Sequence, residues 1–99
     1  YSGGITEIAK ALHKSKDKID FKKLIKYAVR FKSIAVCKRL GYLLELLDLK
    51  KESLEPLQKI KAKSNYMLDP AQPKIGKLIR RWNLRENIDS QSILSPIFS

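Results

Sequence analysis

Lysine and arginine side chains offer the one kind of binding chemistry that this sequence repeats at close spacing. The formal net charge is +11, and residues 10–39 hold eleven Lys or Arg against Asp17 and Asp20 alone. Lysine contacts a phosphate as a point charge, whereas arginine holds it through two parallel hydrogen bonds. A positive field of this kind attracts nucleic acid, an anionic membrane or an acidic protein surface. Solubility at high charge, or a lysine-rich thermophile composition, is the alternative.

Two basic surfaces are predicted to contact nucleic acid. The first is the exposed side of a helix expected over 20–32, with a further basic pair close behind it in sequence. The second is the solvent face of a strand expected over 79–86, for which a charged edge that prevents aggregation is the alternative. Phosphate contacts position a protein without reading bases, so binding to duplex DNA, the partner we expect, should show little sequence preference. The candidate residues are Lys22, Lys23, Lys26, Arg30, Lys38, Arg39, Arg81 and Arg85.

Enzymatic chemistry has few residues to use. His13 is the only histidine and Cys37 the only cysteine, so neither a catalytic triad nor a histidine or cysteine metal site is expected. The carboxylates form no acid–base pair, and no glycine-rich phosphate loop is present. We therefore predict a non-enzymatic protein without cofactor or metal, in which Cys37 packs in the core as a free thiol.

Four helices are expected to position the basic residues. Apolar residues recur at helical spacing near 4–15, 20–32, 34–48 and 53–63. Asp20, Ser33 and Ser53 are natural N-caps for the second, third and fourth of these helices, and Pro56 fits the first turn of the fourth. The third helix is apolar around most of its circumference, which predicts a central position.

Gly41 lies in the middle of this third helix, where glycine costs about 1 kcal/mol relative to alanine. Its place beside the apolar stripe favours the close approach of a neighbouring helix backbone, and a kink is the alternative.

Beyond residue 64 the pattern changes to that of short strands. Pro70, Pro73 and Gly76 are typical of a loop. On its far side, apolar and charged residues alternate around Trp82, as in a half-buried strand. With strands at 65–69 and 79–86, the expected fold class is α+β: four helices followed by a short two-stranded β segment. We expect a single domain over 1–99, with a tail whose apolar residues dock on the body or on a further domain.

No run reaches the roughly 18 uninterrupted apolar residues of a membrane span, and nothing resembles a signal peptide. We therefore expect a cytoplasmic protein that does not enter membranes. The first residue is Tyr1 rather than Met, which favours a fragment of a longer protein.

Three segments in order resemble a known family: GGI-x-E-x-A-x-AL at 3–12, KRLGYLLELL at 38–47 and LDP-x-x-PK-x-G…RWNL at 68–84. Together with the basic helix between the first two, they resemble the C-terminal domain of AbiEi-type antitoxins and related transcriptional regulators of type IV toxin–antitoxin systems. The resemblance covers about 3–86, and the tail beyond Asn87 departs from the family.

The resemblance implies an intracellular regulator in which a winged-helix DNA-binding domain precedes this one. It also implies that this domain carries antitoxicity and assists repression through its positive surface. The functional partner would be a nucleotidyltransferase-like toxin, opposed with or without direct contact. Two alternatives stay open. One is a protein-interaction or dimerisation module, including a homodimer, that uses the third helix and the tail. The other is a small RNA-binding domain that uses the same basic faces.

Overall fold

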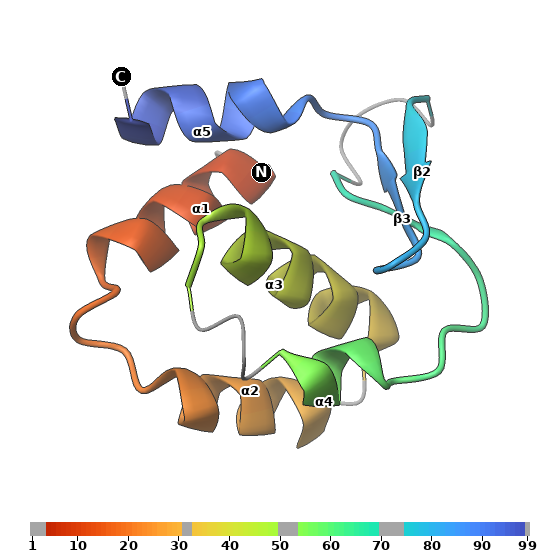
Figure 1. Ribbon diagram of the computed structural model, residues 1–99, viewed down its shortest axis with the longest axis horizontal. Coiled ribbons are helices and arrows are strands. Elements are labelled where there is room, and N and C mark those ends of the chain that lie inside the picture. The colour runs from red at the N-terminus through yellow and green to blue at the C-terminus, as the bar shows by residue number, and fades with distance from the viewer. Residues whose placement is uncertain (1–3, 31–32, 50–53, 70–74, 99) are drawn as a thin grey trace.

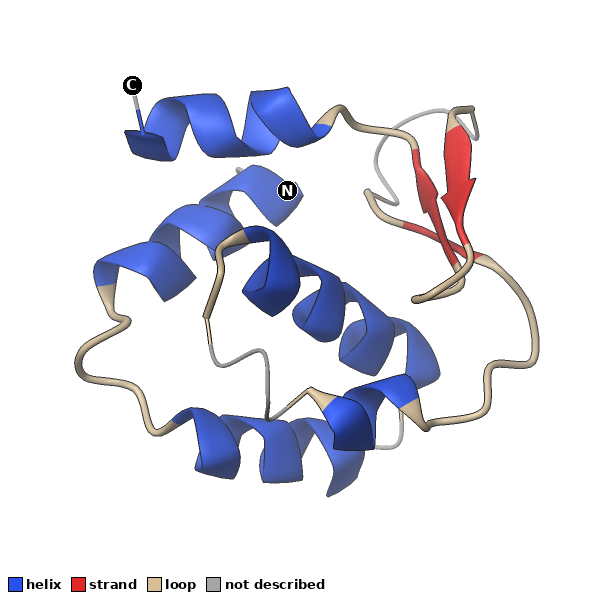
Figure 2. Cartoon of the chain, viewed as in Figure 1, coloured by secondary structure: helices blue, strands red, loops and turns tan. Residues whose placement is uncertain are grey.

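The computed structural model describes residues 4–30, 33–49, 54–69 and 75–98. The described chain is α+β, as predicted: helices dominate, and a small sheet lies between α4 and α5 in sequence (Figures 1 and 2). The elements are α1 (Gly4–Lys14), α2 (Phe21–Arg30), α3 (Ile34–Leu46), α4 (Glu55–Gln58), β1 (Tyr66–Met67), β2 (Lys77–Ile79), β3 (Leu84–Glu86) and α5 (Ser90–Phe98).

Helix α3 lies at the centre of the arrangement. It packs against α2 and α4, while α1 and α5 pack against each other on the opposite side (Figure 1). Cys37, Leu43 and Leu44 of α3 are at most 1% exposed. The central position predicted from the apolar circumference of this helix is therefore confirmed.

Two of the predicted helix caps are present. The Asp20 carboxylate accepts a hydrogen bond from the amide of Lys23 at 3.2 Å, and the Ser33 hydroxyl accepts one from the amide of Val36 at 3.3 Å. Each satisfies an amide that the first turn of its helix leaves without an intrahelical partner. Ser53, the third predicted cap, lies outside the described residues.

Helix α4 is shorter than the helix predicted over 53–63, because it ends at Gln58. The ammonium group of Lys38 donates hydrogen bonds to the carbonyls of Leu57 at 3.3 Å and Gln58 at 3.0 Å. In a longer helix those carbonyls would accept from amides four residues further on. The Lys38 side chain thus takes the place of the next turn and caps the C-terminal end of α4.

The sheet has three strands in the order β1-β3-β2. Strands β1 and β3 are parallel, with Tyr66 opposite Leu84, and β2 runs antiparallel to β3, with Ile79 opposite the same Leu84. The single strand predicted over 79–86 is therefore wrong: that range contains the end of β2, a four-residue turn and β3. The turn is closed by Asn83, whose φ of 52° lies in the left-handed region that asparagine tolerates.

Trp82 lies in this turn rather than in a strand, and its indole packs against α3. It is fully buried, and its Nε1 donates to the Glu45 carboxylate at 3.4 Å. A Cβ at Gly41 would overlap three carbons of the indole ring. Gly41 is buried by close packing, as predicted, but the prediction that a helix backbone approaches it is wrong. A flat aromatic ring fills the space instead.

The tail forms a helix, which was not predicted from the sequence. The carboxylate of Asp89 accepts from the amide of Gln91 at 3.3 Å at the start of α5. Helix α5 packs on α1, and Ile93 is fully buried in the core, so the expectation that apolar residues of the tail dock on the body is confirmed. None of the described helices has both the length and the apolar character that crossing a bilayer requires.

Tyr42 connects α3 to the sheet through a hydrogen bond from its hydroxyl to the Glu86 carboxylate at 3.0 Å. Burial, followed by this bond and the charge of Glu86, raises the pKa of Tyr42 well above its ordinary value of 10.0. Above pH 10 the unfolded chain loses a phenol proton that the folded chain keeps. The stability contributed by Tyr42 is therefore complete below that pH and is lost as the pH rises towards the pKa of the folded protein.

We expect the free energy of unfolding of the wild type to exceed that of Tyr42→Phe by about 1–2 kcal/mol at neutral pH. The difference should shrink above pH 10, by up to about 1.4 kcal/mol per pH unit. Urea unfolding of both proteins between pH 7 and 12 measures this difference in free energy. Taking the difference removes the contribution of the other titrating groups, which both proteins share. A difference that is constant across this pH range would contradict a raised pKa for Tyr42 in the folded protein.

Candidate nucleic-acid interface

Helix α2 presents its basic residues on one side because its core-forming residues occupy the other. Phe21, Ile25 and Ala28 are buried, and their spacing places them on a single helical face. Four cations of α2 are exposed on the remaining surface: Lys22, Lys23, Lys26 and Arg30. The basic helix face predicted from the sequence is thus present in the structure.

These four side chains line one hollow of about 860 Å³, which Glu55 and Pro56 of α4 also border. Within the part of the chain that the structure describes, no ion pair engages any of the four cations. Glu55 is the acidic group at the border, and its carboxylate pairs with Lys59 at 2.8 Å. Because Lys59 offsets the charge of Glu55, the hollow keeps an excess of positive charge. We call these four cations the α2 basic face.

Tyr27 and Val29 also line this hollow, and they were not assigned to it from the sequence. Tyr27 is 61% exposed and Val29 41% exposed. The available signal was their position on α2, since both lie off the apolar stripe that the 3.6-residue period defines. Their side chains give the basic face an apolar component between its charges.

Lys38 does not belong to a basic surface, contrary to the prediction. Its side chain is 1% exposed and its ammonium bonds to the carbonyls at the end of α4. Burial lowers the pKa of the Lys38 ammonium below its ordinary value, an effect that the neighbouring Cys37 partly opposes. A group held in this way stabilises the fold and cannot reach a phosphate.

Arg39, Arg81 and Arg85 are each bound to the protein itself. Arg39 donates from Nε to the carbonyl of Met67 at 2.9 Å, and Arg85 donates to the carbonyl of Gly76 at 3.0 Å. Arg81 forms an ion pair with Glu45 at 2.9 Å, although its side chain remains 59% exposed. The sheet that carries Arg85, with the turn that carries Arg81, lies apart from α2 (Figure 1). The structure therefore does not join the two predicted basic surfaces into one.

Cys37 lies in the core beside the end of α2. The Cys37 thiol is buried and donates to the carbonyl of Ala28 at 3.1 Å. Burial raises the pKa of Cys37 above its ordinary value, which disfavours the reactive thiolate. The prediction of a packed core thiol is confirmed. Among the described residues, no three His, Cys, Asp or Glu side chains gather as a metal site would require.

Comparison of the chain with protein-family models, with curated proteins and with solved structures found no match. The resemblance to the antitoxin family consequently remains a prediction from the three sequence segments.

Proposed function

We propose that this chain is a non-enzymatic DNA-binding domain that contacts the phosphates of duplex DNA through the α2 basic face. The observation that carries the proposal is that Lys22, Lys23, Lys26 and Arg30 lie exposed around a single hollow. Three of the four are lysines, which suit contacts to phosphate that do not depend on base sequence. Binding should therefore be weak, strongly dependent on salt and similar for all sequences.

We further propose that the domain belongs to a cytoplasmic transcriptional regulator of a type IV toxin–antitoxin system. There it would assist binding to the operator and oppose a nucleotidyltransferase-like toxin. The support is the resemblance of 3–12, 38–47 and 68–84. The packing of Trp82 on Gly41 gives the second and third of these segments a physical reason to occur together.

A protein-interaction module is the second candidate function. The observation that favours it is an apolar groove between α1, α2 and α3 that the described chain leaves open to solvent. The two hollows adjoin each other along α2 and share Tyr27, while the apolar groove adds residues of α1 and α3 that the basic face lacks.

Changing Lys22, Lys23 and Lys26 together to Gln should weaken binding to all duplex sequences alike. The slope of log affinity against log salt should fall by up to about 0.9 for each phosphate that the variant no longer neutralises. Fluorescence anisotropy titrations over a range of salt concentrations measure both quantities. The melting temperature should change little, because all three side chains are exposed.

A matched control replaces Lys61, Lys63 and Lys77 by Gln. These three lysines lie on other parts of the surface, and the change in net charge is the same, so the comparison isolates the position of the charges. If both triple variants lose the same affinity and slope, the α2 basic face is not a binding site. Stronger, salt-resistant binding to single-stranded RNA in parallel titrations would favour the RNA-binding alternative instead.

A further inference from the structure

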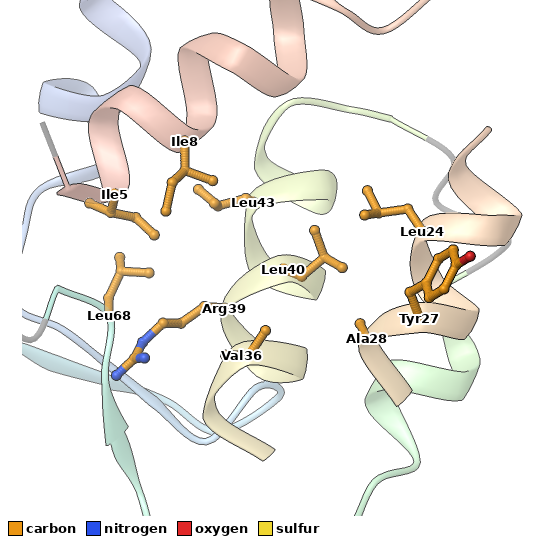
Figure 3. Close-up of a pocket in the computed structure, with 10 residues that line it drawn as sticks. All are labelled: Ile5, Ile8, Leu24, Tyr27, Ala28, Val36, Arg39, Leu40, Leu43 and Leu68. Carbon is orange, nitrogen blue, oxygen red and sulfur yellow. The ribbon is translucent and has the colours of Figure 1, made fainter. Parts of the chain in front are cut away.

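A second hollow, which we call the apolar groove, lies between α1, α2 and α3 (Figure 3). Its volume is about 490 Å³. Helices α1 and α2 form its two walls and α3 its floor, while Leu68 beside β1 closes one end. The side chains that define it are Ile5 and Ile8 of α1, Leu24 and Tyr27 of α2, and Val36 and Leu40 of α3.

The groove exposes apolar surface that the described part of the chain does not cover. Ile8 is 50% exposed, Tyr27 61% and Val36 40%. An enclosed pocket removes most of a small ligand from water, and walls this exposed do not enclose one. A groove framed by helices and open along one side instead fits the apolar face of another helix.

The charge around the groove is positive. Lys23 and Arg30 lie one helical turn before and after Tyr27 on α2, and both are exposed. Arg39 is the charged residue among those that line the groove. The nearby acid on α1, Glu7, is paired with Lys10 at 3.6 Å.

This charge selects among occupants of the groove. A second copy of the chain would bring its own +11 charge to a positive rim and be repelled. A partner with acidic flanks would be attracted.

We propose that the apolar groove binds an acidic amphipathic helix of a partner protein. Apolar side chains of that helix, spaced i, i+3, i+4 and i+7, would enter between α1 and α2 onto α3. Asp and Glu on its flanks would face Lys23 and Arg30. Lys23 and Arg30 also belong to the α2 basic face, but the apolar contacts to Ile8 and Val36 lie outside it, so the proposal can be tested independently of DNA binding.

The probe is a fluorescein-labelled peptide of about 18 residues, or five helical turns. It has Leu at positions spaced i, i+3, i+4 and i+7 along its length and Glu on the flanks. A control peptide carries Gln in place of every Glu. Fluorescence anisotropy should show binding of the acidic peptide, with the Gln peptide bound about fivefold or more weakly. Absence of binding, or equal binding of the two peptides, would overturn the proposal.

Two valine variants of the protein provide the matched comparison. Val36 in the groove and Val29 on the other flank of α2 are 40% and 41% exposed, and each is changed to Glu. Val36→Glu should weaken binding of the acidic peptide about tenfold or more, because it puts a like charge under the bound helix. Val29→Glu makes the same change in net charge and should alter the affinity by less than about twofold. Circular dichroism melting checks that both variants fold.

Equal weakening in both variants would reduce the effect to general charge attraction and overturn the proposal. Sedimentation velocity and binding to vesicles of anionic phospholipid test the other occupants. A wild-type dimer that Val36→Glu dissociates would make the groove a self-association surface. Vesicle binding that is abolished in Val36→Glu but kept in Val29→Glu would assign it to a membrane. Either result would replace the acidic helix as occupant.

Discussion

Gly41→Ala is expected to lower the free energy of unfolding by about 3 kcal/mol, at the upper end of the usual cost of overpacking a core. The added methyl group would overlap the indole of Trp82. That ring cannot move aside easily, because it is fully buried and hydrogen-bonded to Glu45. Urea unfolding and thermal melting measure the loss.

The matching control removes the indole ring of Trp82, which the added methyl group at residue 41 would overlap. In a Trp82→Leu background, Gly41→Ala should cost much less than in the wild type, since residues that touch each other show non-additive effects. Additive costs in the double variant would contradict direct packing of Trp82 on Gly41. A wild-type melting temperature for Gly41→Ala alone would contradict it as well.

Lys38→Ala is expected to destabilise the protein by about 3 kcal/mol, from a cavity and two carbonyls left without a partner. Lys38→Met keeps most of the volume, so it should cost less and separate packing from hydrogen bonding. Urea unfolding measures both variants. If Lys38→Ala leaves the free energy of unfolding unchanged and lowers the salt dependence of DNA binding, Lys38 contacts DNA and does not cap α4.

The alkaline stability of these variants gives an independent check. Burial lowers the pKa of Lys38 below its ordinary value of 10.5, so the unfolded chain binds more protons than the folded chain just below pH 10.5. The stability of the wild type should therefore rise with pH as the pH approaches 10.5, and the methionine variant should lack this contribution. Identical pH profiles would show that the ammonium is not desolvated.

Local signals in the sequence predicted α1, α2 and α3 well because their causes are local. The caps at Asp20 and Ser33 use side chains and amides three residues apart, so sequence spacing alone identifies them. The buried stripe of α2 follows from periodicity in the same way, and it correctly placed the four cations of that helix outside the core.

The remaining errors concern interactions between distant segments. Trp82 alternates with charged neighbours whether it sits in a strand or in a turn that folds back on α3, so the period of two could not separate these cases. Lys38 was assigned to the surface because of its charge. However, Lys38 lies on a helix that is apolar around almost its whole circumference. This position indicates a buried side chain, whose ammonium group needs hydrogen-bond acceptors within the protein. The partners of Arg81 and Arg85, Glu45 and the carbonyl of Gly76, depend on the tertiary fold and have no local signature.

The sequence of the tail contains a signal for a helix, but features typical of an irregular segment outweighed it in the prediction. Ile93, Leu94 and Ile97 have helical spacing behind a capping Asp89, but Pro96 and the serines suggested an irregular segment. Pro96 lies in the last turn of α5, so it removes only the hydrogen bond that an amide at this position would donate to the Ser92 carbonyl, and little helix follows it.

The packing of α1 against α5 also bears on the order in which the chain folds. These helices lie at opposite ends of the described sequence, so their packing closes a loop that includes almost every other element (Figure 1). The entropy of closing such a loop opposes folding until the two helices meet. Nearest neighbours such as α2 and α3 require only short closures. Folding should therefore begin around α3 and finish when α5 packs on α1. The contact between these two helices would then be the last to form.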